Sequence, residues 1–300
     1  MRAVRWPLLA YVPAAAAVTG RRRGLGLPRG LSAAIAGSVP LSVATAMPRS
    51  KVRHALVWAA HMWAYKVAFE VPYDRPDALA RRLRVDYAIA CDSVLGLGTP
   101  PSQRLQRSVR RPPTLVLLDK VLFVVYAAWE LEPHAAMAWL LLRHGDRFPR
   151  AAARLALTFD LTLAGYLAVP TAPPWWASEK RGRMNGEVHR VVVEVLRWLK
   201  GESRPSDHEQ GANPWASMPS DHLASAAMTA IVLGEVSPAA GAAAAAYAAA
   251  LAFALVYLGE HYVVDLLAGL ALAEAVRRLE PALRPIGRLA DEAWTRIEPD

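Results

Sequence analysis

Long stretches almost without charge, separated by blocks rich in arginine and lysine, dominate this sequence of 300 residues. The chain is 54% hydrophobic and 20% charged, against about 45–50% and about 25% in an average soluble protein. This patterning excludes a disordered chain, and the single Cys91 excludes a disulfide scaffold because it has no partner for an internal bridge. The sequence therefore predicts an all-α fold, a polytopic bundle of membrane-spanning helices.

A helix crosses a bilayer with about 20 mostly apolar residues, and about 17 are a practical minimum. The eight predicted spans cover residues 31–47, 55–71, 115–131, 133–143, 154–170, 222–236, 238–258 and 262–278. The short stretch 133–143 is alternatively the second arm of one helix bent at Pro133. Residues 6–19 are expected to form an interfacial helix or a weak extra segment, because the basic run that follows them argues against an exported leader.

Basic residues predict the orientation, because cytoplasmic connections carry an excess of lysine and arginine. A cytoplasmic N-terminus gives 23 basic residues on the inner side and 10 on the outer side. The predicted location is therefore the cell membrane, with both termini cytoplasmic and the basic segment 72–114 on the inner membrane face. The net charge of +9 is interpreted as this topology signal and as contact with anionic lipids, not as nucleic-acid binding.

Three segments with polar or aromatic side chains fall at the ends of predicted spans. They are Met218-Pro219-Ser220-Asp221-His222, Glu260-His261-Tyr262-Val263-Val264-Asp265 and Thr171-Ala172-Pro173-Pro174-Trp175-Trp176. Counting crossings brings all three to the same membrane face, which is the outer face in the predicted orientation. Ionisable groups at membrane depth are costly, so these segments are the candidates for function.

His261 and Asp265 are four residues apart on a predicted helix and share one face. A carboxylate there accepts a hydrogen bond from one imidazole nitrogen and leaves the other nitrogen free as nucleophile or base. In the other motif, Ser220 or Asp221 caps a helix whose free N–H groups favour an anion such as phosphate. His222, in the first turn, is placed to donate a proton to a leaving oxygen.

Other interpretations stay open for these residues. The His–Asp pair is alternatively a satisfied polar pair, and His222, Asp221, His261 and Asp265 are acceptable ligands for a divalent ion. Trp175 and Trp176 either anchor the chain at the interface or wall the site. Lys180, Arg181 and Arg183 either neutralise a phosphate or form a solvated basic loop. Asp160, inside the fifth span, pairs with a basic group or supports the site indirectly.

At these residues the sequence resembles the type 2 phosphatidic acid phosphatase superfamily, and most closely the branch with inositol-phosphorylceramide synthase. Sphingomyelin synthases share similar motifs. The resemblance is carried by Pro219-Ser220-Asp221-His222, His261-Tyr262-Val263-Val264-Asp265 and Ala172-Pro173-Pro174-Trp175. It implies a six-helix catalytic core over 115–280, preceded by a membrane-associated region over 1–114 and followed by a cytoplasmic tail over 281–300.

The resemblance further implies that His261 attacks phosphorus and forms a phosphohistidine, without a metal or other cofactor. Asp265 then orients His261, and His222 is the general acid. The phosphate passes to water in phosphatases or to an alcohol in the synthase branch. The predicted substrate is a phospholipid or a polyprenyl phosphate, and no oligomeric state is predicted.

The sequence departs from the superfamily pattern at three places. Asp221 replaces the usual glycine, and Ala254 and Leu255 replace the usual Ser-Arg, a change shared with the synthase branch. The first motif, Lys-x6-Arg-Pro, has a counterpart only in Arg104 with Arg111-Pro112, which the predicted topology puts on the opposite face, so it is interpreted as coincidence. The missing cations are sought among Lys180, Arg181, Arg183 and Arg190.

The preferred hypothesis is thus a membrane lipid phosphatase or phosphotransferase with its site at the extracytoplasmic face. A metal-dependent membrane hydrolase is the alternative enzyme. A transporter or lipid-binding protein that retains the polar pairs for structure is the non-catalytic alternative, although the sequence shows no inverted repeat.

Overall fold

The computed structural model describes residues 5–110, 114–201 and 213–295, which fold almost entirely into helices. Among them no strand forms, and two isolated bridges link Arg84, Thr171 and Ala216. The predicted all-α class is confirmed. The helices are α1 (Trp6–Gly20), α2 (Arg29–Ala46), α3 (Lys51–Glu70), η1 (Val71–Asp74), α4 (Pro76–Ala80), α5 (Asp86–Leu95), α6 (Pro101–Val109), α7 (Leu117–Ala128), α8 (Glu132–Arg143), α9 (Phe148–Ala168), α10 (Pro174–Arg181), η2 (Arg183–Gly186), α11 (Val191–Lys200), α12 (Asp221–Gly234), α13 (Pro238–Tyr257) and α14 (Val263–Thr295).

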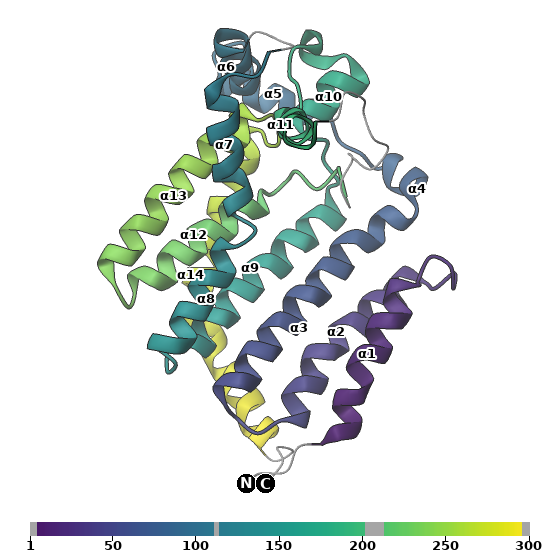
Figure 1. Cartoon of the computed structure of the whole chain (residues 1–300), viewed down its shortest axis with the longest axis vertical. Helices are drawn as coiled ribbons and strands as arrows, with labels where there is room; N and C mark the ends of the chain where they lie inside the picture. Colours follow the sequence, from purple (N-terminus) through teal and green to yellow (C-terminus); the bar gives the residue numbers. More distant parts are fainter. Residues whose placement is uncertain (1–4, 111–113, 202–212, 296–300) are drawn as a thin grey trace.

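The long helices form one bundle, and α8 continues α7 along the same side of it (Figure 1). A turn over 129–131 separates the two, and Pro133 lies at the start of α8, where its missing N–H needs no partner. Stretches 115–131 and 133–143 are therefore two arms of one broken helix. Residues 133–143 were predicted to be either a separate span or the second arm of a helix bent at Pro133, and the structure agrees with the second arm.

Serine side chains start three of the long helices. Ser50, Ser220 and Ser237 accept hydrogen bonds from the N–H groups of Arg53, Leu223 and Ala240 at 3.1, 3.4 and 3.3 Å. A serine oxygen at this position satisfies one of the N–H groups that have no partner inside the helix. The starts of α3, α12 and α13 are thus set by local sequence.

Two glycines let the turn before α12 come close to its neighbours. A Cβ atom on Gly165 of α9 would lie 2.4 Å from Pro219 Cδ, and one on Gly269 of α14 would lie 2.5 Å from the Ser220 carbonyl oxygen. Any larger residue at either position would push this turn away. The Pro219–Ser220 turn is consequently wedged between α9 and α14.

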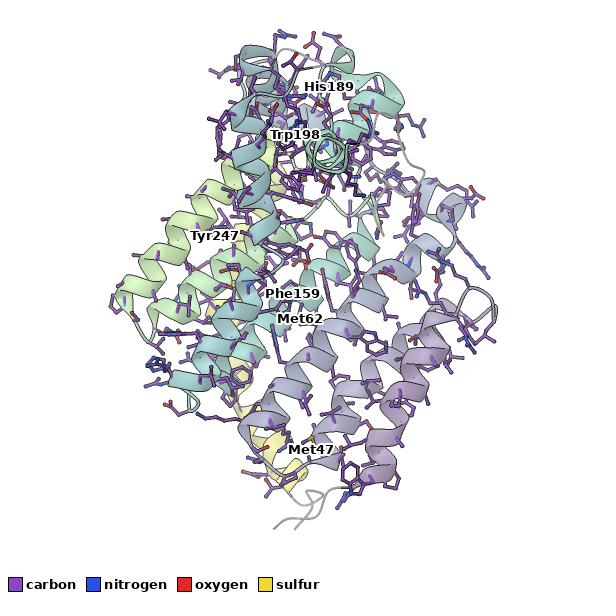
Figure 2. The ribbon with its side chains drawn as sticks, in the orientation of Figure 1. Met47, Met62, Phe159, His189, Trp198 and Tyr247 are labelled. Carbon is purple, nitrogen blue, oxygen red and sulfur yellow. The ribbon has the colours of Figure 1, made fainter. Side chains whose placement is uncertain are left out.

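The main apolar core joins α3, α8, α9, α12 and α14. Met137, Leu140, Leu155, Phe159 and Met228 are its most deeply buried large side chains. Met62 of α3 and Phe159 of α9 lie in the middle of the bundle, away from the end that carries His189 and Trp198 (Figure 2). This packing holds the ends of the same helices in fixed relative positions.

Short helices gather at one end of the bundle, and we call residues 71–109 and 174–200 the cap (Figure 1). The N–H of Arg84 bonds to the carbonyl of Pro170 at 2.8 Å, and the N–H of Ala172 bonds to the carbonyl of Arg84 at 3.0 Å. The end of α9 and residues 72–110 therefore share this end. For these residues the prediction that segment 72–114 lies on the opposite side from the polar motifs is wrong, because long-range backbone pairing places them beside the motifs.

Helix α1 covers the stretch 6–19, which was predicted to be either an interfacial helix or a weak extra segment. The N–H of Arg5 bonds to the carbonyl of Ala46 at 2.9 Å, and Arg22 pairs with Glu70 at 3.2 Å, so α1 runs antiparallel to α2 along the bundle. The predicted orientation in the membrane stays a prediction.

Among the described residues, α13 (Pro238–Tyr257) is the one helix that is both long enough and apolar enough to cross a membrane. Helices α1 and α12 are apolar but shorter. Each of the eight predicted stretches corresponds to a helix or, for 115–131 and 133–143, to one arm of a broken helix, while their crossing of a membrane stays a prediction.

Candidate active site

Both histidine motifs lie where long helices begin at the cap end. Ser220 caps α12, which places His222 in its first turn, and His261 lies in the connection between α13 and α14. The N–H of Ser220 bonds to the carbonyl of Asp265 at 2.9 Å, so the two motifs are tied together by their backbones. Each motif is positioned by the helix start or connection that carries it, and the backbone hydrogen bond between Ser220 and Asp265 holds the two motifs together.

The two imidazole rings meet. Nε2 of His261 lies 3.2 Å from Nδ1 of His222, and the ring centroids are 5.2 Å apart at an angle of 69°. His261 is buried, with 3% of its surface exposed. A hydrogen bond at this distance requires a proton on one of the two nitrogens.

Asp265 lies on the other side of the His261 ring. Its Oδ2 is 3.4 Å from Nδ1 of His261, and it accepts hydrogen bonds from Ser217 Oγ at 2.6 Å and from the N–H of Tyr262 at 2.9 Å. Ser217 Oγ is also 3.4 Å from Nδ1 of His261. Sequence reasoning missed Ser217, which stands just before the predicted motif but outside any helical register that would have signalled it.

Two aromatic rings of the broken helix lie against His222. The ring of Trp129 is 4.1 Å from that of His222 between centroids, and the ring of Tyr126 is 5.3 Å away. Trp129 donates through Nε1 to Ser225 Oγ at 2.8 Å, which fixes its indole on α12. These two residues were also absent from the predicted site, because nothing in the sequence marks them among other aromatic residues of an apolar helix.

Ser220 and Asp221 have their oxygens turned to the protein. Ser220 Oγ caps its own helix. The two carboxylate oxygens of Asp221 accept hydrogen bonds from Tyr65 at 2.6 Å and Thr162 at 2.9 Å. Asp221 is among the residues that line the cavity, and each of its carboxylate oxygens has a side-chain donor.

A cavity of about 390 Å³ opens onto the two histidines. Its polar lining includes Ser217, Asp221, His222, Glu260, His261 and Arg190, together with Lys66, Glu130 and His134, and Trp175 also lines it. Away from the histidines the walls are mainly aromatic and apolar, with Met62, Phe69, Trp129, Pro133 and Phe159. A ligand with one polar group and an apolar body matches this shape.

The two predicted tryptophans have different surroundings. Trp175 lies in the cavity wall, and the guanidinium of Arg190 is 4.4 Å from its ring centroid. Trp176 does not line the cavity and instead packs edge-on against Trp215 at 5.8 Å. Arg181 lies over the Trp176 ring at 5.3 Å.

Among the described residues, the basic side chains that line the cavity are Arg190 and Lys66. Nε of Arg190 donates to Glu260 at 3.0 Å, and its side chain is 16% exposed. Lys180 and Arg181 are exposed on α10 and are not among the lining residues. Arg183 pairs with Asp86 at 2.7 Å.

The cap fastens the connection that carries His261. Both oxygens of Asp92 on α5 accept hydrogen bonds at 2.9 Å from the N–H groups of Val263 and Val264, the first residues of α14. Gln106 on α6 donates to the carbonyls of His189 and Tyr257 at 3.0 and 2.8 Å. Burial raises the pKa of Asp92 to about 6, although the two N–H donors act in the opposite direction.

The remaining predicted features lie elsewhere. Asp160 is 3.4 Å from His61 on α3 and is not among the residues that line the cavity. Arg104 lies on α6 of the cap, at the same end as the histidine motifs. The argument that the first-motif counterpart lies on the opposite face therefore no longer applies to Arg104. Arg111 and Pro112 are outside the described residues. In the part of the chain that the structure describes, no three His, Cys, Asp or Glu side chains are grouped to hold a metal ion. These residues therefore provide no ligand set for the alternative of a metal-dependent hydrolase.

Comparison with known families gives one result. A family model described as the PAP2 superfamily matches residues 89–278, which is more than half of the chain. The matched range begins in α5, so it includes both histidine motifs and part of the cap. No curated protein and no solved structure matches the chain.

Proposed function

The chain belongs to the PAP2 superfamily, and from this membership and the paired rings we propose a membrane lipid phosphatase or phosphotransferase that works through a phosphohistidine. Superfamily membership supports phosphatase-type activity on phosphorylated lipids. The observation that carries the proposal is the 3.2 Å contact between His261 Nε2 and His222 Nδ1, with Asp265 on the opposite side of the His261 ring.

The proposed chemistry starts from one proton arrangement. A proton on His261 Nδ1 faces Asp265, which leaves Nε2 with its lone pair. The proton in the contact between the rings then belongs to His222 Nδ1. His222 acts as the acid in its imidazolium form, with a second proton on Nε2, and becomes neutral imidazole when it gives up the Nδ1 proton, while His261 is the nucleophile. A contact of 3.2 Å leaves no space for a phosphorus atom between the nitrogens, so the rings part when the phosphate enters.

In the first step, His261 Nε2 forms a bond to phosphorus and the bond from phosphorus to the leaving oxygen breaks. His222 gives its proton to that oxygen, and Asp265 stabilises the charge that develops on the His261 ring. In the second step, His222 takes a proton from water or an alcohol whose oxygen attacks phosphorus. The bond to His261 then breaks, and the resting protonation states return.

We favour the synthase-like branch within this proposal. Its support is the pair Ala254 and Leu255 in place of Ser-Arg, which is the departure that this branch shares. The aromatic and apolar walls of the cavity suit a lipid, a phospholipid or a polyprenyl phosphate. In the same proposal the site belongs to a multi-pass protein of the cell membrane and opens on the extracytoplasmic face.

The experiment uses purified protein in detergent with a lipid that is radiolabelled in its phosphate. Release of free phosphate identifies hydrolysis, and a new labelled phosphodiester in the presence of an alcohol identifies transfer. His261→Ala is expected to abolish turnover and the acid-labile label on the protein. Full turnover by His261→Ala would overturn the proposed function.

A further inference from the structure

Asp221 lines the cavity but takes no part in the proposed chemistry. Its Oδ2 accepts a hydrogen bond from Tyr65 on α3 at 2.6 Å, and its Oδ1 accepts one from Thr162 on α9 at 2.9 Å. Its own N–H donates to the hydroxyl of Tyr166, also on α9, at 3.0 Å. Since Asp221 is the first residue of α12, it joins α3 and α9 to the helix that carries His222.

We call the side chains of Tyr65, Asp221 and Thr162 the clamp. Asp221 is 4% exposed and Thr162 is fully buried. The ring of Tyr65 packs against that of Phe159 on α9, with 5.1 Å between the centroids. A buried carboxylate that loses one of its donors is costly, so the clamp holds α3 at a fixed distance from His222.

The clamped helix forms one wall of the cavity. Its lining residues are three or four positions apart and therefore share one face of α3: Met62, Tyr65, Lys66 and Phe69. Lys66 is exposed, and the other three are aromatic or apolar. The broken helix of α7 and α8 supplies Trp129 and Pro133 to the same lining, and α9 lies between α3 and α8 (Figure 1).

This wall has a limited length. From Phe69 to Met62 it extends about 10 Å at 1.5 Å per residue, and Met62 and Phe159 lie in the middle of the bundle (Figure 2). One turn further along α3, Trp58 Nε1 donates to Nδ1 of His134 on α8 at 3.2 Å. His134 lines the cavity and Trp58 does not, so their contact marks the end away from the paired histidines.

We infer that α3 is the element that selects the lipid's apolar chain, with Tyr65 and Asp221 holding it beside His222 and its face over 62–69 binding the part of the chain next to the phosphate. Helix α3 lies before residues 89–278, the range that matches the superfamily. Tyr65 and Asp221 are positioning residues. The inference rests on the proposed function for its turnover measurements, and a labelling measurement on protein that cannot turn over keeps the two separable.

The first test compares butyl phosphate with decyl phosphate, which differ only in the length of the chain. Tyr65→Phe keeps the ring and removes the hydroxyl that holds Asp221. KM for decyl phosphate is expected to rise by tenfold or more and KM for butyl phosphate by less than threefold, because only the longer chain extends along α3. Each KM is compared with that of wild type for the same ester in the same detergent. Equal factors for the two esters would overturn the inference.

A double-mutant cycle tests the clamp itself. Asp221→Ala is expected to raise KM for decyl phosphate as Tyr65→Phe does, and the double variant by no more than twofold over the larger single effect, since both changes break one hydrogen bond. Factors that multiply in the double variant would refute the clamp. The matched control is Tyr247→Phe, which removes a donor to the carbonyl of Val125 at 3.0 Å outside the cavity lining and should keep the wild-type ratio of the two KM values.

The second test needs no turnover. His261→Ala protein is photolabelled with decyl phosphate that carries a diazirine in its chain, with and without an excess of unlabelled decyl phosphate. Label that the excess displaces is expected on the tryptic peptide 54–66, which contains Met62 and Tyr65, and Tyr65→Phe should reduce it at least fivefold.

This labelling supports the inference even if wild-type protein turns over neither ester, in which case only the proposed function fails. Displaceable label that is missing from peptide 54–66, or that Tyr65→Phe leaves unchanged, rejects α3 as the selecting wall whatever the turnover shows.

Discussion

At the scale of single residues, the two carboxylate oxygens of Asp265, beside His261, have different hydrogen-bonding environments. Oδ2 receives Ser217 and the N–H of Tyr262, while Oδ1 is buried without a hydrogen-bond partner among the described residues. A buried carboxylate oxygen without a donor is costly on its own. In the proposed mechanism its negative charge is offset once the His261 ring carries the extra positive charge of the phosphohistidine.

Replacement of Asp265 tests this orienting role. Asp265→Asn keeps the size of the side chain but offers an NH2 group or a neutral oxygen to Nδ1, which favours the wrong tautomer of His261. Turnover is expected to fall by about 10² to 10⁴-fold, with little change in KM. Ser217→Ala, which removes one donor to the same carboxylate, is expected to cost only about 2- to 10-fold. Equal rates for Asp265→Asn and wild type would contradict the orienting role.

The Trp129 indole, against the ring of His222, offers a second residue-scale test. Trp129→Leu removes the aromatic contact, which is worth about 0.5–1.5 kcal/mol, and frees the ring of the proposed acid. We expect kcat to fall by about 2- to 10-fold on this basis, together with a shifted limb of the kcat–pH profile. Trp129→Phe keeps a ring at the site and is expected to restore the profile. A profile in Trp129→Leu that matches wild type would show that the contact is purely structural.

At the scale of elements, α5 of the cap controls the start of α14. Asp92 supplies both hydrogen bonds to the first N–H groups of this helix, although it is more than 170 residues away along the chain. Because α14 carries Asp265 and begins just after His261, the position of this proposed catalytic pair depends on a side chain from another segment. Segment 72–114 thus has a structural role that its basic composition does not indicate.

Loss of this cap is expected to affect stability and turnover together. Asp92→Ala leaves the N–H groups of Val263 and Val264 without their partner, and loss of a helix cap costs about 0.5–2 kcal/mol. The melting temperature and kcat should both fall, with KM nearly unchanged. Asp86→Ala, on the same helix but 70% exposed in its pair with Arg183, is the control. A normal kcat in folded Asp92→Ala protein would show that α5 does not position His261.

The raised pKa of Asp92 predicts a dependence on pH. Burial raises this pKa from 3.8 to about 6, so folding favours the protonated form. The stability that Asp92 contributes is fully present below about pH 4 and is lost as the pH rises to about 6. The melting temperature of wild type should therefore fall relative to that of Asp92→Ala across this interval. Thermal melts at steps of pH check it, and parallel curves would mean that Asp92 has an ordinary pKa.

At the scale of the whole molecule, the bundle has two different ends. One carries the cap, the paired histidines and the cavity, and the other carries the α2–α3 and α8–α9 connections and the end of α14 (Figure 1). Many cap cations lie in folded, ion-paired segments, such as Arg107 with Glu187 and Arg183 with Asp86. Long loops and domains are translocated largely regardless of their charge. The proposed extracytoplasmic site therefore needs a direct measurement.

Cys91 gives that measurement without any added reporter. It is the single cysteine of the chain, it is exposed, and it lies on α5 at the cap end. A membrane-impermeant maleimide is expected to label it in intact cells. The control is Cys91→Ser with Asp146→Cys, which moves the thiol to the exposed α8–α9 connection and should react only after the cells are broken. The reverse pattern would put the site on the cytoplasmic face.

The long helices of the bundle, the cap of α12 at Ser220 and the convergence of the two histidine motifs at one end were predicted from the sequence by itself, whereas the short helices of the cap were not. Apolar length, proline and serine caps act over a few residues, and the order of the helices brings both motifs to one end. Only the tertiary structure decided that 72–114 joins that end, that Arg190 and not Lys180 or Arg181 lines the cavity, and that Asp221 faces Tyr65 and Thr162. These outcomes depend on contacts between residues far apart in the chain, for which no local pattern in the sequence provides a signal.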